Sequence, residues 1–206
     1  MTKFGTAIIL AGGKSRRMGF DKQFLIINEE RLITKIVKQL KRIFINILVV
    51  TNKPEAYHET DLRTVSDIYL GLGPLAGIHA GLMESQSEYA FVIACDMPQL
   101  NLELIEIQMA FLEENEANAL VTRTPEGYLM PFHGFYSKKL IKPLAQTLEA
   151  KNLKLQMFLE EQHINTFDYE SIKPFIEPDH LFTNLNTVEE LENYLNDIGG
   201  NYDPEA

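Results

Sequence analysis

Short apolar runs alternate along this chain with segments in which apolar residues recur every three or four positions. The runs predict buried strands, and the periodic segments predict helices with one apolar face. The expected strands cover residues 4–10, 46–51, 64–66, 89–95, 119–123 and 129–136. The expected helices cover residues 33–43, 75–83, 102–112, 137–150 and 153–161, and a capping-box sequence at residues 187–190 opens a last helix.

Strands that alternate with helices imply an α/β fold, with a mostly parallel sheet covered by helices on both faces. Ligands of such folds bind beyond the carboxyl ends of the strands, so we expect the chemistry just after residues 10, 51 and 95. The chain of 206 residues shows neither an internal repeat nor a dividing linker, which predicts one domain over residues 1–198. Residues 199–206 begin with two glycines and are expected to form a frayed tail.

The negative net charge of the chain restricts the classes of partner that it can bind. The formal net charge is −10, from 29 acidic and 19 basic residues, so the summed field repels polyanions. We therefore expect neither nucleic acid nor a membrane as a partner, although a small anion can bind where positive charge is concentrated. The apolar runs are too short to span a bilayer, and the single cysteine, Cys95, excludes an intramolecular disulfide and a cysteine-based zinc cluster. The cytoplasm is the expected compartment.

Positive charge is concentrated in the loop after the first expected strand. Residues 10–22 read Leu-Ala-Gly-Gly-Lys-Ser-Arg-Arg-Met-Gly-Phe-Asp-Lys, and the three glycines allow backbone amides to approach an anion. Lys14, Arg16, Arg17 and Lys22 fall within nine positions, where the chain average would give fewer than one cation. Arginine can bind phosphate through two parallel N–H groups, and lysine binds it as a point charge. The loop therefore predicts a clamp for a triphosphate or pyrophosphate.

Two common phosphate-binding motifs do not fit this loop. A Walker A loop that ends at Gly13-Lys14-Ser15 would need its first glycine at Ile8. The spaced glycines of a dinucleotide-binding loop are also missing, and no acidic residue closes a following strand. A flexible turn with solvated charges is the simpler alternative, but it does not explain why glycines, cations and a strand end coincide.

A second candidate site follows the expected strand 89–95, where Asp96, Met97 and Pro98 end an apolar run. A carboxylate in this position can hold a hard cation, and Mg²⁺ needs few protein carboxylates when substrate phosphates supply the other oxygens. The alternative is an aspartate that accepts backbone amides at a helix start. Cys95 is expected to be a small buried residue and not a nucleophile, because phosphoryl-type transfer needs none.

Three further segments carry polar residues where strands end or helices begin. Asp67 follows the short third strand and precedes the sequence Gly-Leu-Gly-Pro-Leu-Ala-Gly at residues 71–77, a tight turn that starts a helix. Thr51 and Asn52 end the second strand. Asn-Leu-Asn-Thr at residues 184–187 precedes the last helix, where its asparagines either bind a ligand or only shape a turn.

Histidines do not form a metal-binding pattern in this sequence. His133 lies in an apolar run, where a lone histidine is usually a structural residue, and we expect that role for it. The other four histidines are scattered without the spacing of metal ligands.

The loop sequence resembles the opening signature of the molybdenum cofactor guanylyltransferases, in its Leu-Ala-Gly-Gly, Ser-x-Arg-Met-Gly and Asp-Lys elements. Asp-x-Pro, Gly-Pro-Leu-Ala-Gly and Asn-x-Asn-Thr are similar to further segments of that family, so the resemblance covers nearly the whole chain. It implies a three-layer Rossmann-like nucleotidyltransferase fold with a mostly parallel mixed sheet. It also implies an Mg²⁺-dependent enzyme that transfers GMP from GTP to the terminal phosphate of molybdopterin, with or without molybdenum, and releases pyrophosphate.

The resemblance implies roles for particular residues. Those that would bind GTP are Leu10, Ala11, Gly12, Gly13, Lys22, Asp67 and Asp96. Asp96 would hold Mg²⁺ and would form the catalytic set with Lys22 and Arg17, of which Arg17 would lie nearer the pterin phosphate. Asn184 and Asn186 would face the pterin. Transient contact with other cofactor-biosynthesis proteins, or with the enzyme that receives the cofactor, is also implied.

Two other functions remain open on the sequence. The first is a related enzyme that uses CTP on molybdopterin or on a sugar-alcohol or isoprenoid phosphate, but its loop would more often read Leu-Ala-Ala-Gly. The second is a non-catalytic GTP-binding regulator, which need not keep Asp96 together with Lys22. In the family an asparagine near the end of the second strand contacts the base, and here that position falls at Thr51 or Asn52.

Overall fold

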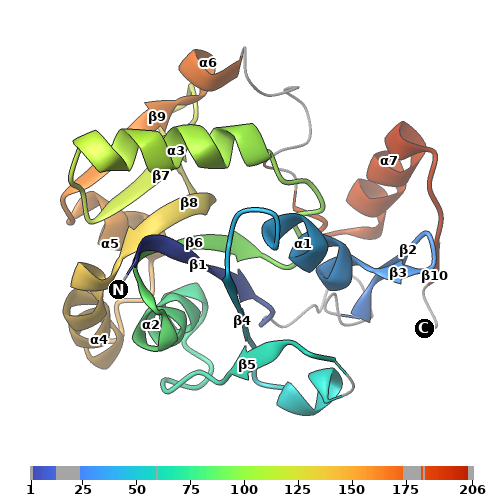
Figure 1. The fold of residues 1–206 in the computed structure, drawn as a ribbon, viewed down its shortest axis with the longest axis horizontal. Helices are drawn as coiled ribbons and strands as arrows, with labels where there is room; N and C mark the ends of the chain where they lie inside the picture. Colours follow the sequence, from blue (N-terminus) through green and yellow to red (C-terminus); the bar gives the residue numbers. More distant parts are fainter. Residues whose placement is uncertain (1, 13–23, 59, 174–181, 183, 204–206) are drawn as a thin grey trace.

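The computed structural model describes residues 2–12, 24–58, 60–173, 182 and 184–203 of the chain. A seven-stranded sheet forms its centre, with the strand order β5-β4-β1-β6-β8-β7-β9 (Figure 1). Its strands are β1 (Thr2–Leu10), β4 (Asn46–Val50), β5 (Arg63–Val65), β6 (Ser87–Ala94), β7 (Ala119–Arg123), β8 (Leu129–Ser137) and β9 (Ile164–Asp168). Neighbouring strands are parallel except beside β8, which runs antiparallel to β6 and β7. The expected mostly parallel mixed sheet is confirmed.

Helices cover both faces of this sheet, which gives the three layers seen in Figure 1. They are α1 (Leu32–Leu40), α2 (Pro74–Glu84), α3 (Leu102–Glu114), α4 (Ile141–Glu149), α5 (Leu155–Glu160), α6 (Tyr169–Ile172) and α7 (Val188–Ile198), with the 3-10 turns η2 (Pro54–Tyr57) and η3 (Lys138–Leu140). Residues of α1, α3 and α7 belong to one apolar cluster, and residues of α2, α4 and α5 belong to another. No helix in the described part of the chain is long and apolar enough to cross a membrane.

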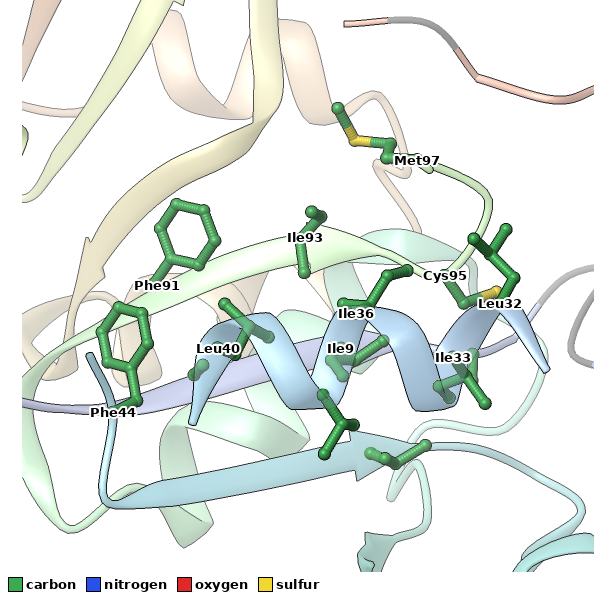
Figure 2. Close-up of a cluster of buried hydrophobic side chains, with 14 of the residues drawn as sticks. Ile9, Leu32, Ile33, Ile36, Leu40, Phe44, Phe91, Ile93, Cys95 and Met97 are labelled. Carbon is green, nitrogen blue, oxygen red and sulfur yellow. The ribbon is translucent and has the colours of Figure 1, made fainter. Parts of the chain in front are cut away.

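The two apolar clusters lie on opposite faces because the side chains of a strand alternate. In β1, Ala7 and Ile9 belong to the cluster of α1, while Ile8 and Leu10 belong to the cluster of α2. Figure 2 shows the apolar stripe of α1 turned toward Ile9 of β1 and Ile93 of β6. Each large side chain buried in this way contributes about 1.5–3 kcal/mol, so the stripe holds α1 on the sheet.

Two helix starts predicted from the sequence are confirmed. Before α3, Asn101 Oδ1 accepts a hydrogen bond of 2.7 Å from the backbone N–H of Leu104. Before α7, Thr187 Oγ1 accepts from the N–H of Glu190, and the Glu190 carboxylate accepts from the N–H of Thr187. These reciprocal bonds form the expected capping box.

Two elements in the second half of the chain, one strand and one helix, differ from the sequence prediction. Strand β9 was not expected, and the reason is that its five residues are half-buried or exposed and form no apolar run. The expected helix 137–150 begins later than predicted. Ser137 is still the last residue of β8, the turn η3 follows it, and α4 starts only after η3.

The expected frayed tail also differs, because it is paired as far as Asp203. Strand β10 (Tyr202–Asp203) joins β2 (Ile26–Ile27) and β3 (Glu30–Arg31) in a small sheet. Gly199 makes this possible, since its φ of 62° ends α7 and turns the chain back. The backbone N–H of Asn28 then donates to the carbonyl oxygen of Asn201 at 3.0 Å. Figure 1 shows α7 beside this small sheet.

Candidate functional site

The carboxyl ends of β1, β4, β5 and β6 meet at one edge of the sheet. Leu10 pairs in register with Val50 and Ala94, and Val50 pairs with Val65. Backbone hydrogen bonds continue one residue further, from Ala11 N–H to Val50 O (2.8 Å), from Thr51 N–H to Val65 O (2.9 Å) and from Cys95 N–H to Leu10 O (3.0 Å). The residues that follow these strands are therefore brought together, as the parallel topology predicts.

The first strand ends in two buried side chains and one open position. Leu10 is 8% exposed and Ala11 is 3% exposed, so both side chains belong to the core and only their backbone can face a ligand. Gly12 is exposed, and a Cβ added to it would meet nothing within 4 Å in the described structure. The predicted roles of Gly13, Arg17 and Lys22 lie outside the described residues, as do Lys14 and Arg16.

Asp67 and Asn52 form a polar pair at this edge. The Nδ2 group of Asn52 donates a hydrogen bond of 3.2 Å to Asp67 Oδ2. The second carboxylate oxygen, Oδ1, is buried and has no hydrogen-bond partner among the described residues. Burial raises the pKa of Asp67, and the hydrogen bond from Asn52 opposes this effect. A buried acceptor without a partner is the type of group that a ligand donor can satisfy.

The start of α2 lies close to Asp67 of this pair. Gly73 has a φ of 77° and precedes Pro74, the first residue of α2, so the chain enters the helix through a tight turn. A Cβ on Gly77 would lie 3.0 Å from Leu10 Cδ2 and 3.7 Å from Asp67 Oδ1. A glycine therefore allows the first turns of α2 to approach both the end of β1 and the Asp67 carboxylate.

The structure distinguishes the neighbours Thr51 and Asn52, which the sequence left as alternatives. Thr51 is 1% exposed, and its Oγ1 accepts a hydrogen bond of 3.0 Å from the N–H of Lys53. Asn52 is exposed at the open edge and contacts Asp67. A carboxylate can only accept, so the amide nitrogen of Asn52 faces Asp67 and the amide oxygen is directed elsewhere as an acceptor.

Asp96 follows β6 and is half-buried. One backbone hydrogen bond closes a tight turn around it, and a second joins its carbonyl oxygen to a distant segment. The N–H of Met97 donates to Ala94 O at 3.2 Å, and the N–H of Leu185 donates to Asp96 O at 2.9 Å. Asn101, and not Asp96, caps α3, which disfavours the interpretation of Asp96 as a helix-start residue. Cys95 is buried, as expected for a small core residue.

The bond to Leu185 brings the Asn-x-Asn-Thr segment beside Asp96. Leu185 is fully buried, and the N–H groups of Asn186 and Thr187 both donate to the Glu190 carboxylate, at 2.6 and 2.8 Å. Asn184 Oδ1 is buried and lacks a partner within the part of the chain that the structure describes. The segment is therefore fixed at the site, and it carries a second buried acceptor that a ligand could satisfy.

Comparisons with known proteins show which sequences and structures this chain is similar to. A family model described as the MobA-like NTP transferase domain matches residues 7–166. A probable molybdenum cofactor guanylyltransferase of Peptoclostridium acidaminophilum is 42% identical, over 93% of this chain and 88% of its own. The molybdenum cofactor guanylyltransferase of Syntrophotalea carbinolica is also 42% identical, over 93% of this chain and 91% of its own.

Two solved structures show the same fold. Molybdopterin-guanine dinucleotide biosynthesis protein A from Archaeoglobus fulgidus superposes with a TM-score of 0.84 at 22% identity, over 94% of this chain and 98% of that chain. The bifunctional IspDF from Campylobacter jejuni superposes with a TM-score of 0.72 at 17% identity, over 93% of this chain and 54% of that one.

Proposed function

Because the chain belongs to the family of MobA-like NTP transferases, we propose that it transfers GMP from GTP to the terminal phosphate of molybdopterin. Its full-length relatives at 42% identity are named for guanylyl transfer in the synthesis of this cofactor. The structural observation that carries the proposal is the hydrogen bond from Leu185 to Asp96, which joins a strand-edge nucleotide site to a second polar segment. Two substrates need two such subsites that meet at the reacting phosphates.

The reaction is an in-line displacement at the α-phosphorus of GTP. A terminal phosphate oxygen of molybdopterin forms a bond to this phosphorus, the bond to the β-phosphate bridging oxygen breaks, and pyrophosphate leaves. No protein nucleophile is required, which agrees with the burial of Cys95. The protein therefore contributes by positioning two anionic substrates and by stabilising the charge between them.

The nucleotide side of the site is assigned to the ends of β1, β4 and β5. The backbone of Leu10, Ala11 and Gly12 runs past the nucleotide, and Asp67 with Asn52 supplies the polar contacts. Guanine differs from adenine in its N1–H and 2-amino donors, which need acceptors in the protein. The amide oxygen of Asn52 and the unpaired Oδ1 of Asp67 are acceptors of this kind. Leaving the buried Oδ1 of Asp67 unpaired would penalise a base without those donors, whereas the exposed Asn52 adds little to this penalty.

Asp96 fits a magnesium ion that is held mainly by substrate oxygens. Within the described residues, no group of three or more His, Cys, Asp or Glu side chains gathers as a metal centre. A single carboxylate with several phosphate oxygens is a usual donor set for Mg²⁺, and the bound ion would neutralise charge on the phosphates. Lys22 and Arg17 are proposed to neutralise the remaining phosphate charge from the glycine-rich loop.

The pterin side is assigned to Asn184 and Asn186. A pterin ring presents both donors and acceptors, and asparagine side chains can match both. The unpaired Oδ1 of Asn184 supports this assignment, because a ring N–H would satisfy it. The fixed backbone of residues 184–187 would hold the ring at a constant distance from Asp96.

Competition between nucleotides tests this proposal against the CTP-using enzyme. Binding of labelled GTP is measured with magnesium and molybdopterin present, and unlabelled GTP, CTP and ATP are added as competitors. GTP is expected to compete far better than either of the others. Equal competition by CTP would replace the guanylyl assignment with a cytidylyl one. Binding of GTP without any pyrophosphate release would instead favour the non-catalytic regulator.

A further inference from the structure

His133 has an unusual backbone conformation in the middle of β8. Its φ of 62° lies in the left-handed region, which a residue other than glycine rarely adopts within a strand. The register between β7 and β8 shifts here, because Leu120 pairs with Phe135 while Thr122 pairs with Met130. A Cβ on the next residue, Gly134, would lie 2.6 Å from Leu120 O, so the irregular strand packs tightly on β7.

The imidazole of His133 is fully buried and hydrogen bonded to the loop that follows Asp96. His133 Nε2 accepts a hydrogen bond of 3.2 Å from the backbone N–H of Asn101. Burial lowers the pKa of His133 to about 4, so the ring is neutral and its Nε2 keeps the lone pair that this bond needs. The carbonyl oxygen of His133 also accepts from Gln108 Nε2 at 3.1 Å, which ties β8 to α3.

The same ring contacts the segments that carry the two halves of the site. It meets Phe91 of β6 edge-on, with ring centroids 5.0 Å apart, and Phe182 edge-on at 6.2 Å. Phe91 lies on the strand that leads to Asp96, and Phe182 lies two residues before Asn184. One side chain thus touches the Asp96 loop through Asn101, the strand before it through Phe91, and also the ring of Phe182.

We propose that His133 is a positioning residue for the pterin side of the site, which holds the loop from Asp96 to Asn101, the side chain of Phe182 and the residues from Asn184 to Asn186 in one arrangement. A residue that only fills the core would gain nothing from a left-handed backbone, since any apolar side chain in a regular strand would pack there. The conformation instead places Nε2 where it can reach a backbone N–H at the far end of the Asp96 loop. This inference rests on the proposed guanylyl transfer for the identity of the second substrate.

Variants of His133 separate the hydrogen bond from the packing. His133→Phe keeps an aromatic ring against Phe91 and Phe182 but cannot accept from Asn101. His133→Gln keeps an acceptor at a similar reach. Asparagine tolerates a positive φ but is too short to reach Asn101, so His133→Asn replaces the phenylalanine variant if that one does not fold. His163→Gln, at an exposed position, is the matched control.

The decisive measurement is steady-state transfer with molybdopterin and GTP varied separately. His133→Phe is expected to lower kcat/KM for molybdopterin about tenfold or more, because the part-buried N–H of Asn101 loses the acceptor that His133 supplies. The affinity for GTP measured without magnesium, which does not depend on Asp96 as a metal ligand, should change less than about twofold. His133→Gln should recover most of that loss, and His163→Gln should match the unmodified protein. An equal loss of affinity for GTP measured without magnesium, or no difference between His133→Phe and His133→Gln, would overturn the proposal.

Amide hydrogen exchange without substrates keeps this test independent of the proposed activity. In His133→Phe, exchange at Asn101 and Leu185 is expected to be faster than in the unmodified protein, with the β1 amides unchanged. If the unmodified protein transfers no guanylyl group, the proposed function fails but the exchange result still stands for or against His133. Unchanged exchange at both amides would reject the positioning role even in an active enzyme.

Discussion

The backbone N–H of Leu185 donates a hydrogen bond of 2.9 Å to the carbonyl oxygen of Asp96. This bond joins the end of the central strand β6 to the segment that opens the last helix, α7. Leu185 is fully buried, so its side chain anchors the segment while Asn184 and Asn186 on either side are less buried. The turn after β6 and the segment before α7 therefore share a fixed backbone contact at Asp96.

Asp96→Asn should abolish most activity without unfolding the protein. The amide has nearly the shape of the carboxylate but lacks its charge, and the backbone bond to Leu185 is retained. Loss of a metal ligand removes several kcal/mol of charge stabilisation, so turnover should fall by about a hundredfold or more. Transfer rates at rising magnesium, with circular dichroism as the folding control, check this. Full activity of the variant at saturating magnesium would falsify the ligand role.

Asn184→Asp should impair transfer to molybdopterin and leave GTP binding nearly intact. The variant keeps the size of the side chain but places a negative charge opposite an anionic substrate and removes the amide donor. Isothermal titration with GTP and transfer assays at varied molybdopterin measure the two effects. Asn186→Asp should act in the same direction. Asn193→Asp, at an exposed position on α7, serves as the control. Loss of GTP binding in Asn184→Asp would show that Asn184 contacts GTP and not the pterin.

The meeting of the strand ends at one edge could be predicted from the sequence, because it follows from the order of apolar runs along the chain. Leu10 ends an apolar run, Asp96 follows one, and Asp67 follows the short third strand; parallel strands bring such ends to one edge of the sheet. The cap at Asn101 and the capping box at Thr187 were also confirmed, since they depend on residues within one helical turn.

The contacts between distant segments could not be predicted in this way. The bond from Leu185 to Asp96 depends on tertiary packing and uses only backbone atoms, so no residue type marks it. The choice between Thr51 and Asn52 depends on the ladder bond from Thr51 to Val65, which extends the strand by one residue and buries Thr51. His133 was expected to be an ordinary core residue, because an apolar run does not show where a strand changes register.

Asp67→Asn should stabilise the fold near neutral pH and weaken nucleotide binding. Burial raises the pKa of Asp67 in the folded protein above its ordinary value of 3.8, so folding disfavours the charged form. The native state then binds the proton more tightly than the unfolded chain. Stability is therefore lost as the pH rises from the unfolded pKa of Asp67 through its folded pKa. Asparagine at position 67 carries no charge, so it avoids this loss of stability. Its amide oxygen can still accept the hydrogen bond from Asn52.

Thermal unfolding of both proteins at several pH values checks this sign. The advantage of Asp67→Asn should be present at neutral pH and should shrink as the pH falls below the folded pKa of Asp67. GTP titration of the same samples should show weaker binding, as expected where a site residue is kept at the expense of stability. If the stability gained by Asp67→Asn over the unmodified protein were smaller at neutral pH than at acid pH, the argument would be contradicted.

Lys22→Ala should weaken triphosphate binding more than nucleoside binding. The prediction comes from four cations on a glycine-rich loop in a chain of net charge −10. Removal of one point charge near the phosphates should raise the Kd for GTP about tenfold, as for loss of a charge-assisted hydrogen bond, and leave the Kd for guanosine nearly unchanged. Titrations with both ligands compare the effects, with exposed Lys154→Ala as the control. Equal weakening of both would exclude Lys22 as a phosphate contact.

Transfer of the α-phosphate is the most direct test of the central claim. The purified protein is incubated with molybdopterin, magnesium and GTP labelled either at the α- or at the γ-phosphorus, and the products are separated. The proposed reaction predicts that the α-label appears in a pterin dinucleotide and that the γ-label appears only in pyrophosphate. A γ-label in free phosphate with no α-label on the pterin would contradict guanylyl transfer and would leave a protein that binds or hydrolyses GTP.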